Sequence, residues 1–240
     1  VRTELAGYRM GQGLAGKKIV ISAGGTQENL DPVRYLGNRS SGRQGFALAE
    51  IAAQRGANVT LVAGNTVNLP VPSGADVRKV VSTAELQAAM EEKARDADVV
   101  IMAAAVADYR PAHIAESKMK KGQADAELSS IQLVENPDVL KGIVAKRDAG
   151  ELNPNAVIVG FAAETGDATH SALDFAKEKF LKKGCDLLMD NEVGEGKAFG
   201  QSDSEGWILS RDAAPQVVAH GSKHVVASQI LDAVQEIMSN

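Results

Sequence analysis

Short runs of apolar residues, separated by amphipathic segments, constrain the fold of this chain more than any other feature. Runs that predict buried strands cover residues 18–23, 57–63, 77–81, 98–106, 156–163, 186–190 and 207–210. Apolar residues at helical spacing predict helices over 40–55, 83–95, 137–147, 168–183 and 222–238. This alternation is typical of a mostly parallel sheet with helices on both faces. We therefore expect a Rossmann-like α/β fold.

Three stretches depart from this pattern. Residues 128–134 alternate between apolar and polar side chains, as an edge strand does, whereas residues 111–127 and 192–205 have no period. Long polar loops within a compact domain are often lids or binding loops, so we expect active-site loops there. The glycine-rich residues 1–16 resemble a linker from a missing amino-terminal domain, and a single domain is expected over 17–240.

Composition excludes several classes of protein. A net charge of -5 argues against a protein that mainly binds nucleic acid. No run of about 18 apolar residues occurs, so no membrane span is expected. The single cysteine, Cys185, cannot form an internal disulfide and suits a reducing cytoplasm.

Candidate ligand-binding residues follow the predicted strands, because ligands bind at the carboxyl edge of an open parallel sheet. Gly24, Gly25 and Thr26 could bring phosphate oxygens to backbone N–H groups, or could simply form the turn after the first strand. The spacing matches neither G-x-G-x-x-G nor a P-loop. The second strand ends in Gly64 and Asn65, without the acidic residue that holds an NAD ribose. Both features argue against a nicotinamide dehydrogenase.

A second candidate segment, residues 38–45, combines Asn38 with two hydroxyl groups and two glycines where a helix is predicted to begin. Side-chain donors and the helix dipole could together bind an anion there. The alternative is that Ser40 or Ser41 only caps the helix.

Four further features each have a functional and a structural interpretation. Asp108 could bind Mg²⁺ together with phosphates, or could cap a turn. Residues 103–105 are alanines, which could admit a flat ring or could allow tight helix packing. Lysines in the loop segment 118–121 could bind a phosphate or form a solvated surface. Lys179 and Lys183 could also bind a phosphate, or could complement a helix dipole.

A catalytic nucleophile is not apparent. Cys185 lies before an apolar strand without a nearby histidine and is interpreted as a core thiol. The four histidines lack metal-ligand spacing, and no G-x-S-x-G motif occurs.

Six segments, taken together and in order, resemble the phosphopantothenoylcysteine synthetase family, the carboxy-terminal half of bifunctional bacterial coenzyme A proteins. They are GGTQENLDPVRYLGNRSSGRQG (24–45), AAAVADYRP (103–111), KMKK (118–121), ENPDVL (135–140), GFAAET (160–165) and KEKFLKKGCDLLMDNEV (177–193). The resemblance covers nearly everything from Lys17 onward.

The resemblance implies a ligase of coenzyme A biosynthesis that uses CTP and Mg²⁺. The carboxylate of 4'-phosphopantothenate attacks the α-phosphate of CTP, which gives an acyl-cytidylate and pyrophosphate. Cysteine then displaces CMP to form an amide. No protein nucleophile is required, in agreement with the absence of one in the sequence.

The resemblance also implies roles for individual residues. Asn38 matches the asparagine that contacts the acyl-cytidylate and assists its turnover, and Arg34 matches a residue near the phosphopantothenate end. Lys118 matches the first lysine of a strap that contacts the triphosphate, and Asp108 matches the acidic residue near the cation. The remaining residues of the predicted nucleotide site are Gly24, Gly25, Ser40, Ser41, Gly42, Ala104, Ala105, Pro137, Asp138, Val139, Phe161, Lys179 and Lys183.

The family further implies a homodimer with the acyl-substrate site near the interface, and a flavin-dependent decarboxylase domain in the full-length chain. Two alternatives remain open. An NADP-dependent oxidoreductase of the short-chain dehydrogenase type would need a glycine fingerprint and a Tyr-x-x-x-Lys pair, which the chain lacks. A non-catalytic nucleotide-binding module would bind CTP without releasing pyrophosphate.

Overall fold

The computed structural model describes residues 13–122, 128–164, 169–192, 203–211 and 213–239. An eight-stranded sheet in the order β12-β11-β10-β9-β6-β1-β4-β5 forms its centre. The strands are β1 (Lys18–Ala23), β4 (Asn58–Ala63), β5 (Ala75–Lys79), β6 (Val99–Met102), β9 (Val157–Glu164), β10 (Leu187–Glu192), β11 (Asp203–Ser210) and β12 (Gln216–Ser222). In this order, every pair of adjacent strands from β10 through β9, β6, β1 and β4 to β5 is parallel. Strand β11 is antiparallel to both β10 and β12.

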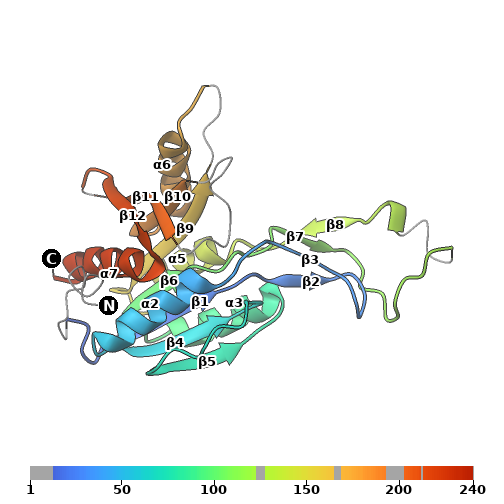
Figure 1. The fold of residues 1–240 in the computed structure, drawn as a ribbon, viewed down its shortest axis with the longest axis horizontal. Helices are drawn as coiled ribbons and strands as arrows, with labels where there is room; N and C mark the ends of the chain where they lie inside the picture. The colour runs from blue at the N-terminus through green and yellow to red at the C-terminus, as the bar shows by residue number, and fades with distance from the viewer. Residues whose placement is uncertain (1–12, 123–127, 165–168, 193–202, 212, 240) are drawn as a thin grey trace.

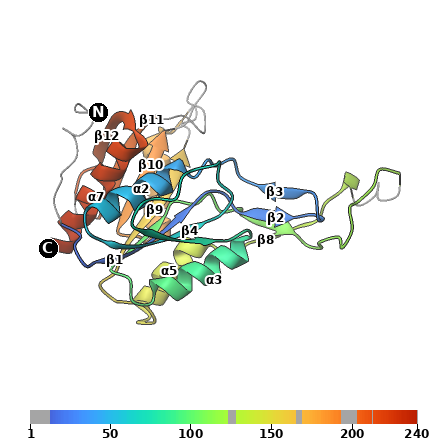
Figure 2. The same ribbon diagram turned by 60° about the horizontal axis from the view of Figure 1, so that its bottom comes forward.

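Helices cover both faces of this sheet. Helices α2 (Arg43–Gln54) and α7 (Lys223–Ser239) lie on one face (Figure 1). Helices α3 (Thr83–Ala94), α5 (Val139–Asp148) and α6 (Ala172–Lys183) lie on the other, where Figure 2 shows α3 beside α5. The expected Rossmann-like α/β fold is confirmed. None of the described helices is both long enough and apolar enough to span a bilayer.

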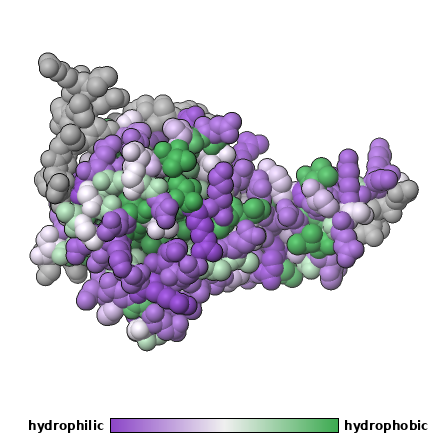
Figure 3. Space-filling model, turned by 90° about the horizontal axis from the view of Figure 1, so that it is seen from below, coloured by the Kyte–Doolittle hydropathy of each residue, from purple (hydrophilic) through white to green (hydrophobic). Residues whose placement is uncertain are grey.

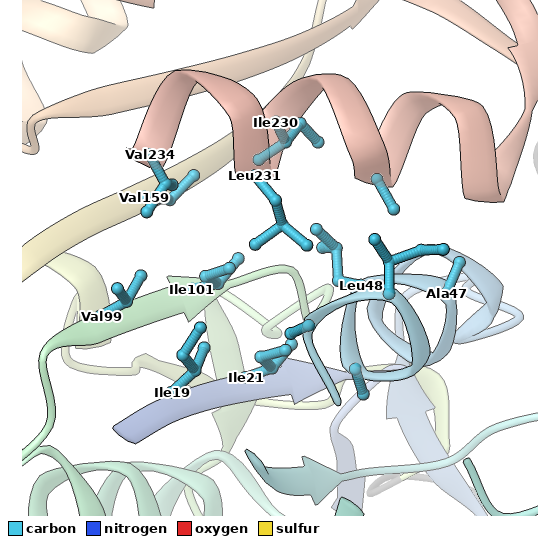
Figure 4. Close-up of a cluster of buried hydrophobic side chains, with 14 of the residues drawn as sticks. Ile19, Ile21, Ala47, Leu48, Val99, Ile101, Val159, Ile230, Leu231 and Val234 are labelled. Atoms are coloured by element: carbon cyan, nitrogen blue, oxygen red, sulfur yellow. The ribbon is translucent and has the colours of Figure 1, made fainter. Parts of the chain in front are cut away.

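The core explains why the central strands are almost entirely apolar. Alternate side chains of a strand point to opposite faces, and here both faces are covered. In Figure 4, Ile21 and Ile101 of the sheet lie beneath Leu48 of α2 and Leu231 of α7. The alternate residues of the same strands, such as Val100, point to the opposite face of the sheet. There they pack in a second hydrophobic cluster with residues of α3, α5 and α6.

The contact between α2 and β1 requires a glycine. A Cβ atom on Gly45 would lie 2.5 Å from Cβ of Ala23 and 3.0 Å from the carbonyl oxygen of Ser22. We expect Gly45→Ala to lower the free energy of unfolding by about 1–3 kcal/mol, because this contact would have to open. Urea unfolding followed by far-ultraviolet circular dichroism measures this change. Gly142→Ala in α5 is the matched control, since its Cβ would meet nothing within 4 Å; an equal loss in both variants would contradict the explanation.

The direction in which strands are added reverses between β1 and β6. From β1 the chain adds β4 and β5 on one side, and it then returns to add β6, β9 and β10 on the other. The carboxyl ends of β1 and β6 meet there through a bridge between Gly25 and Ala105. Such a switch point is where ligands bind in open α/β sheets.

Two small antiparallel ribbons project from this carboxyl edge (Figure 1). One joins β2 (Gln27–Asn29) to β3 (Tyr35–Gly37), and the other joins β7 (Tyr109–Pro111) to β8 (Leu133–Glu135). We call the described residues of 27–37 and 109–135 the arm. The sequence analysis predicted no helix or strand for the first ribbon, and it predicted an edge strand over 128–134 for the second. The edge-strand prediction is wrong, because only the last residues of that run pair, and they pair with β7 outside the main sheet.

Other element boundaries also differ from those expected. Strand β6, which was predicted over 98–106, ends at Met102, since residues 103–106 turn away at the carboxyl edge. Strand β11 begins earlier, within the stretch that lacked periodicity, and β12 was not predicted. Leu14 is buried and its N–H donates to the carbonyl of Arg55 at 3.2 Å, so residues 13–16 pack on the folded body. The rest of the expected linker, and residues 123–127 and 193–202 of the aperiodic loops, lie outside the described residues.

Candidate functional site

Asn38 lies beside the switch point, between the arm and α2. Its Nδ2 donates to the carbonyl oxygen of Val106 at 3.0 Å. A Cβ atom on Gly25 would lie 2.7 Å from the carbonyl oxygen of Asn38, so glycine allows these two backbones to touch. The side chain of Asn38 is exposed, and within the described part of the chain its Oδ1 accepts no hydrogen bond. A substrate could therefore reach a fixed amide group.

The turn after β1 is held by bonds within the protein. The N–H of Gly25 donates to the carbonyl of Asn65 at 2.9 Å, and the N–H of Thr26 donates to the carbonyl of Ala105 at 3.2 Å. Gly24 has a φ of +80°, and a Cβ atom there would lie 2.4 Å from the carbonyl oxygen of Asn65. Turn formation and close backbone packing therefore account for both glycines. Their assignment to the nucleotide site stays a prediction.

The start of α2 has no side-chain cap. Its N-cap is Gly42, with a φ of 78°, so the N-cap residue has no side chain that could accept a capping hydrogen bond. Oγ of Ser40 accepts from the N–H of Gly42 at 3.4 Å, and Oγ of Ser41 accepts from the N–H of Arg43 at 3.5 Å. The alternative that Ser40 or Ser41 caps the helix is therefore wrong about the N-cap position, although both hydroxyls bind N–H groups where the helix begins. An uncapped helix start at the carboxyl edge offers N–H groups and a positive dipole end to an anion.

A buried polar network joins the arm to the sheet. Asn136 donates through Nδ2 to the carbonyl of Ala107 at 2.9 Å and to Oγ1 of Thr83 at 3.3 Å. Thr26 accepts from the hydroxyl of Thr83 at 3.1 Å and from the N–H of Ala107 at 2.8 Å. Glu28 accepts from the N–H of Thr83 at 2.8 Å. The network fixes the loops after β1 and β6 against the base of the arm.

Asp108 lies directly beside this network. Its carbonyl accepts from the N–H of Asn136 at 2.7 Å, and Arg110 donates to Oδ1 of Asn136 at 2.9 Å. The carboxylate of Asp108 is exposed and makes no hydrogen bond or ion pair with another described residue. Among the described residues, no three His, Cys, Asp or Glu side chains gather into a metal site. A cation at Asp108 would therefore need most of its ligands from elsewhere.

Two residues of the predicted nucleotide site are paired with each other. Asp138 caps α5 by accepting from the N–H of Lys141 at 3.1 Å, and its other oxygen accepts from Nζ of Lys183 at 2.6 Å. Asp138 thus has a structural role as the cap of α5, which the sequence analysis did not predict, and Lys183 is held near the start of α5. Pro137, exposed, and Val139, buried, flank this cap.

Of the other predicted pocket residues, Ala104 and Ala105 follow β6 at the carboxyl edge, whereas Phe161 and Lys179 lie on β9 and α6. Ala104 and Ala105 are half-buried, and the N–H of Ala104 donates to Oγ of Ser22 at 3.1 Å. Phe161 of β9 packs against the core beneath α2 and α7. Lys179 is half-buried on α6.

Arg34 and Lys118 lie in the arm, away from the turn after β1. Lys118 is exposed, and Nη2 of Arg34 donates to the carbonyl of Met119 at 3.1 Å. The fold thus brings Arg34 into contact with the residue that follows Lys118, 85 positions away in sequence.

Cys185 is a core thiol, as the sequence predicted. It is buried, and desolvation raises the pKa of its thiol to about 11. We expect iodoacetamide at about pH 8.5 to label the native chain roughly two orders of magnitude more slowly than the urea-unfolded chain, because the thiolate reacts and the native thiol keeps its proton. Mass spectrometry over time measures both rates; equal rates would contradict the buried, protonated state.

With this geometry established, comparison with known proteins assigns the family. The model of the DFP family, the DNA/pantothenate metabolism flavoprotein C-terminal domain, matches residues 14–238. The chain belongs to this family. The resemblance that six segments predicted is confirmed.

Relatives and solved structures of this DFP domain agree with the assignment. The coenzyme A biosynthesis bifunctional protein CoaBC of Mycolicibacterium smegmatis is 50% identical over 227 residues, which cover 95% of this chain and 54% of the relative. CoaBC of Vibrio vulnificus strain CMCP6 is 42% identical over 95% of this chain and 54% of the relative. A crystal structure of the C-terminal domain of CoaBC is 30% identical, with a TM-score of 0.75, and the match covers 95% of this chain and 98% of that one. The chain thus spans about half the length of the curated relatives it matches.

Sequence reasoning missed the polar groups that position the site of this DFP domain. Thr83 was only part of a predicted helix, and Asn136 was only part of the matched segment 135–140. Their hydrogen-bond partners lie tens of positions away, so the sequence around each residue carries no signal of the contact.

Proposed function

We propose that this chain is a CTP-dependent phosphopantothenate–cysteine ligase of coenzyme A biosynthesis. One observation carries the proposal: the segments 24–45 and 103–111 meet at the carboxyl ends of β1 and β6, and the arm that carries Arg34 and Lys118 projects from that edge. Asn38 is fixed at the switch point, and Asp108 lies beside it at the base of the arm. The name of the relatives supports the pathway.

In the first half-reaction, a carboxylate oxygen of 4'-phosphopantothenate attacks the α-phosphorus of CTP. The bond between the α-phosphorus and its bridging oxygen breaks, and pyrophosphate leaves with the electron pair. Both reactants are anions, so cationic groups must lower their repulsion. We assign Lys118, Lys179 and Lys183 to the triphosphate, and Arg34 to the phosphopantothenate end. The uncapped start of α2 supports binding of a further anionic group.

In the second half-reaction, the amine of cysteine attacks the acyl carbon of the acyl-cytidylate. The amide bond forms, the acyl–phosphate bond breaks, and CMP leaves while the amine loses a proton. We assign Asn38 to this step because its amide is exposed and oriented by Val106. Removing a donor of this kind typically slows a step by about 10²–10³-fold.

Magnesium fits the arrangement at Asp108. This ion usually binds one or two carboxylates together with substrate phosphates, and Asp108 offers one exposed carboxylate without another partner among the described residues. When bound, the ion would neutralise charge on the triphosphate.

The arm supports a homodimer. Figure 3 shows apolar patches on the arm. The exposed large apolar or aromatic side chains of the arm are Val33, Tyr35, Tyr109, Ile114, Ile131, Leu133 and Val134. Exposed apolar patches rimmed by polar residues are typical of interaction sites. We propose that two copies associate through the arm, that the full-length protein carries a flavin-dependent decarboxylase domain before this one, and that it works in the cytoplasm. A monomeric mass in sedimentation equilibrium would contradict the dimer.

The test measures pyrophosphate and CMP release with CTP, Mg²⁺, 4'-phosphopantothenate and cysteine, each omitted in turn. The ligase should release pyrophosphate only when CTP and phosphopantothenate are both present, and cysteine should increase CMP release. Replacing CTP by ATP tests the choice of nucleotide. CTP binding without pyrophosphate release would instead indicate a non-catalytic module.

A further inference from the structure

The turn between β2 and β3 contains a fully buried carboxylate. The side chain of Asp31 is 0% exposed. Its Oδ1 accepts from the N–H of Val33 at 2.7 Å and from the N–H of Arg34 at 2.8 Å. These two bonds are the usual way in which an aspartate stabilises its own turn.

The second carboxylate oxygen of Asp31 binds a residue outside the turn. Its Oδ2 accepts from the N–H of Met119 at 3.2 Å, across 88 positions of sequence. Arg34 donates to the carbonyl of the same residue at 3.1 Å. A third bond, from the N–H of Ala115 to the carbonyl of Leu30 at 2.9 Å, lies beside them. Both backbone polar groups of Met119 are thus bound by the hairpin turn.

The electrostatics of this contact keep Asp31 ionised. Burial alone would raise the pKa of the carboxyl. The N–H donors of Val33, Arg34 and Met119, together with the guanidinium of Arg34, outweigh burial and hold the pKa below its ordinary value. Each of the two bonds to Met119 therefore has one charged partner, the carboxylate of Asp31 or the guanidinium of Arg34. Such bonds are stronger than bonds between two neutral groups.

We infer that Asp31 is a positioning residue for Lys118, the residue next to Met119. The inference rests on the proposed function, in which Lys118 binds the triphosphate. Asp31 and Arg34 fasten the loop that carries this lysine to the hairpin that carries Arg34. The groups assigned to CTP and to phosphopantothenate are thereby held as one unit before either substrate binds. Such preorganisation lowers the entropic cost of bringing two reactants together.

Asp31→Asn separates this role from turn formation. The new Oδ1 can still accept from Val33 and Arg34, whereas the new Nδ2 would face the N–H of Met119, donor against donor. The variant should keep the turn between β2 and β3 but lose the hydrogen bond to Met119 in the loop. Glu116→Gln is the matched control, because Glu116 is exposed in the same loop and the change removes one negative charge without touching Met119.

Limited trypsin digestion gives a readout that does not depend on activity. Trypsin cleaves after lysine, and Lys118, Lys120 and Lys121 all lie in the loop. We expect Asp31→Asn to be cleaved there at least about tenfold faster than the wild type and the control, because lost bonds open the loop. Thermal unfolding by circular dichroism should show both variants folded. Equal cleavage in the wild type and Asp31→Asn would overturn the inference.

Kinetics then separate positioning from a general structural defect. Asp31→Asn should raise KM for CTP in pyrophosphate release by about tenfold. It should leave unchanged the rate at which cysteine releases CMP from acyl-cytidylate already formed. A loss shared equally by both half-reactions would overturn the inference. If the wild type itself shows no ligase activity, the proposed function fails, and the cleavage rates still decide whether Asp31 holds the loop.

Discussion

Replacing Asn38 by aspartate is expected to slow turnover of the acyl-cytidylate strongly while CTP binding stays nearly intact. The amide Nδ2 of Asn38 donates to the carbonyl oxygen of Val106 at 3.0 Å, and a carboxylate has no proton to donate there. The new side chain would be repelled by that carbonyl and would add negative charge beside a phosphoester. We expect cysteine-dependent CMP release to slow by about 10²–10³-fold.

The measurement combines two assays on the same variant. Quenched reactions with phosphopantothenate and CTP should show acyl-cytidylate accumulating, and calorimetry should show CTP binding close to that of the wild type. Asn68→Asp is the control, since it makes the same change on an exposed loop residue. Loss of CTP binding in Asn38→Asp would contradict the role of Asn38 in the second half-reaction.

The central sheet was predictable because its strands are buried on both faces. The strands that carry Ile21 and Val100 are buried on both faces, so nearly all of their residues are apolar, and the buried Ser22 on β1 uses its hydroxyl in hydrogen bonds. The helices were predictable because one face of each packs on this sheet. The position of the candidate site followed from the predicted strands, because ligands bind at the carboxyl ends of the strands in an open parallel sheet.

The arm could not be predicted in the same way. Its strands are three residues long, and β8 is exposed along its whole length, so burial imposes no period on the sequence. Pairing of β7 with β8 joins segments separated by a long loop, and nothing near either strand indicates the partner. The same holds for Asp31, which reads as an ordinary turn residue although its Oδ2 binds Met119. Family resemblance supplied Lys118 and Arg34, but their connection through Asp31 appears only in three dimensions.

Replacing Lys118 by glutamine is expected to impair the first half-reaction. Lys118 is exposed on the arm, and its backbone is held through the neighbouring Met119. Glutamine keeps much of the length and the polarity but removes the positive charge that we assign to the triphosphate. A charge-assisted contact to a leaving phosphate contributes on the order of 1.5–3 kcal/mol, so pyrophosphate release should fall by roughly 10- to 100-fold.

The two half-reactions make this prediction specific. The rate of CMP release from preformed acyl-cytidylate should stay close to that of the wild type, because pyrophosphate has already left and no charge at the β- and γ-phosphates remains to be stabilised. Lys79→Gln is the matched control, since Lys79 is exposed at the end of β5 and loses the same charge. Higher salt should narrow the difference between wild type and Lys118→Gln, as screening weakens an exposed charge contact. Unchanged pyrophosphate release in Lys118→Gln would remove this lysine from the mechanism and leave the bonds of Asp31 and Arg34 to Met119 with a structural role alone.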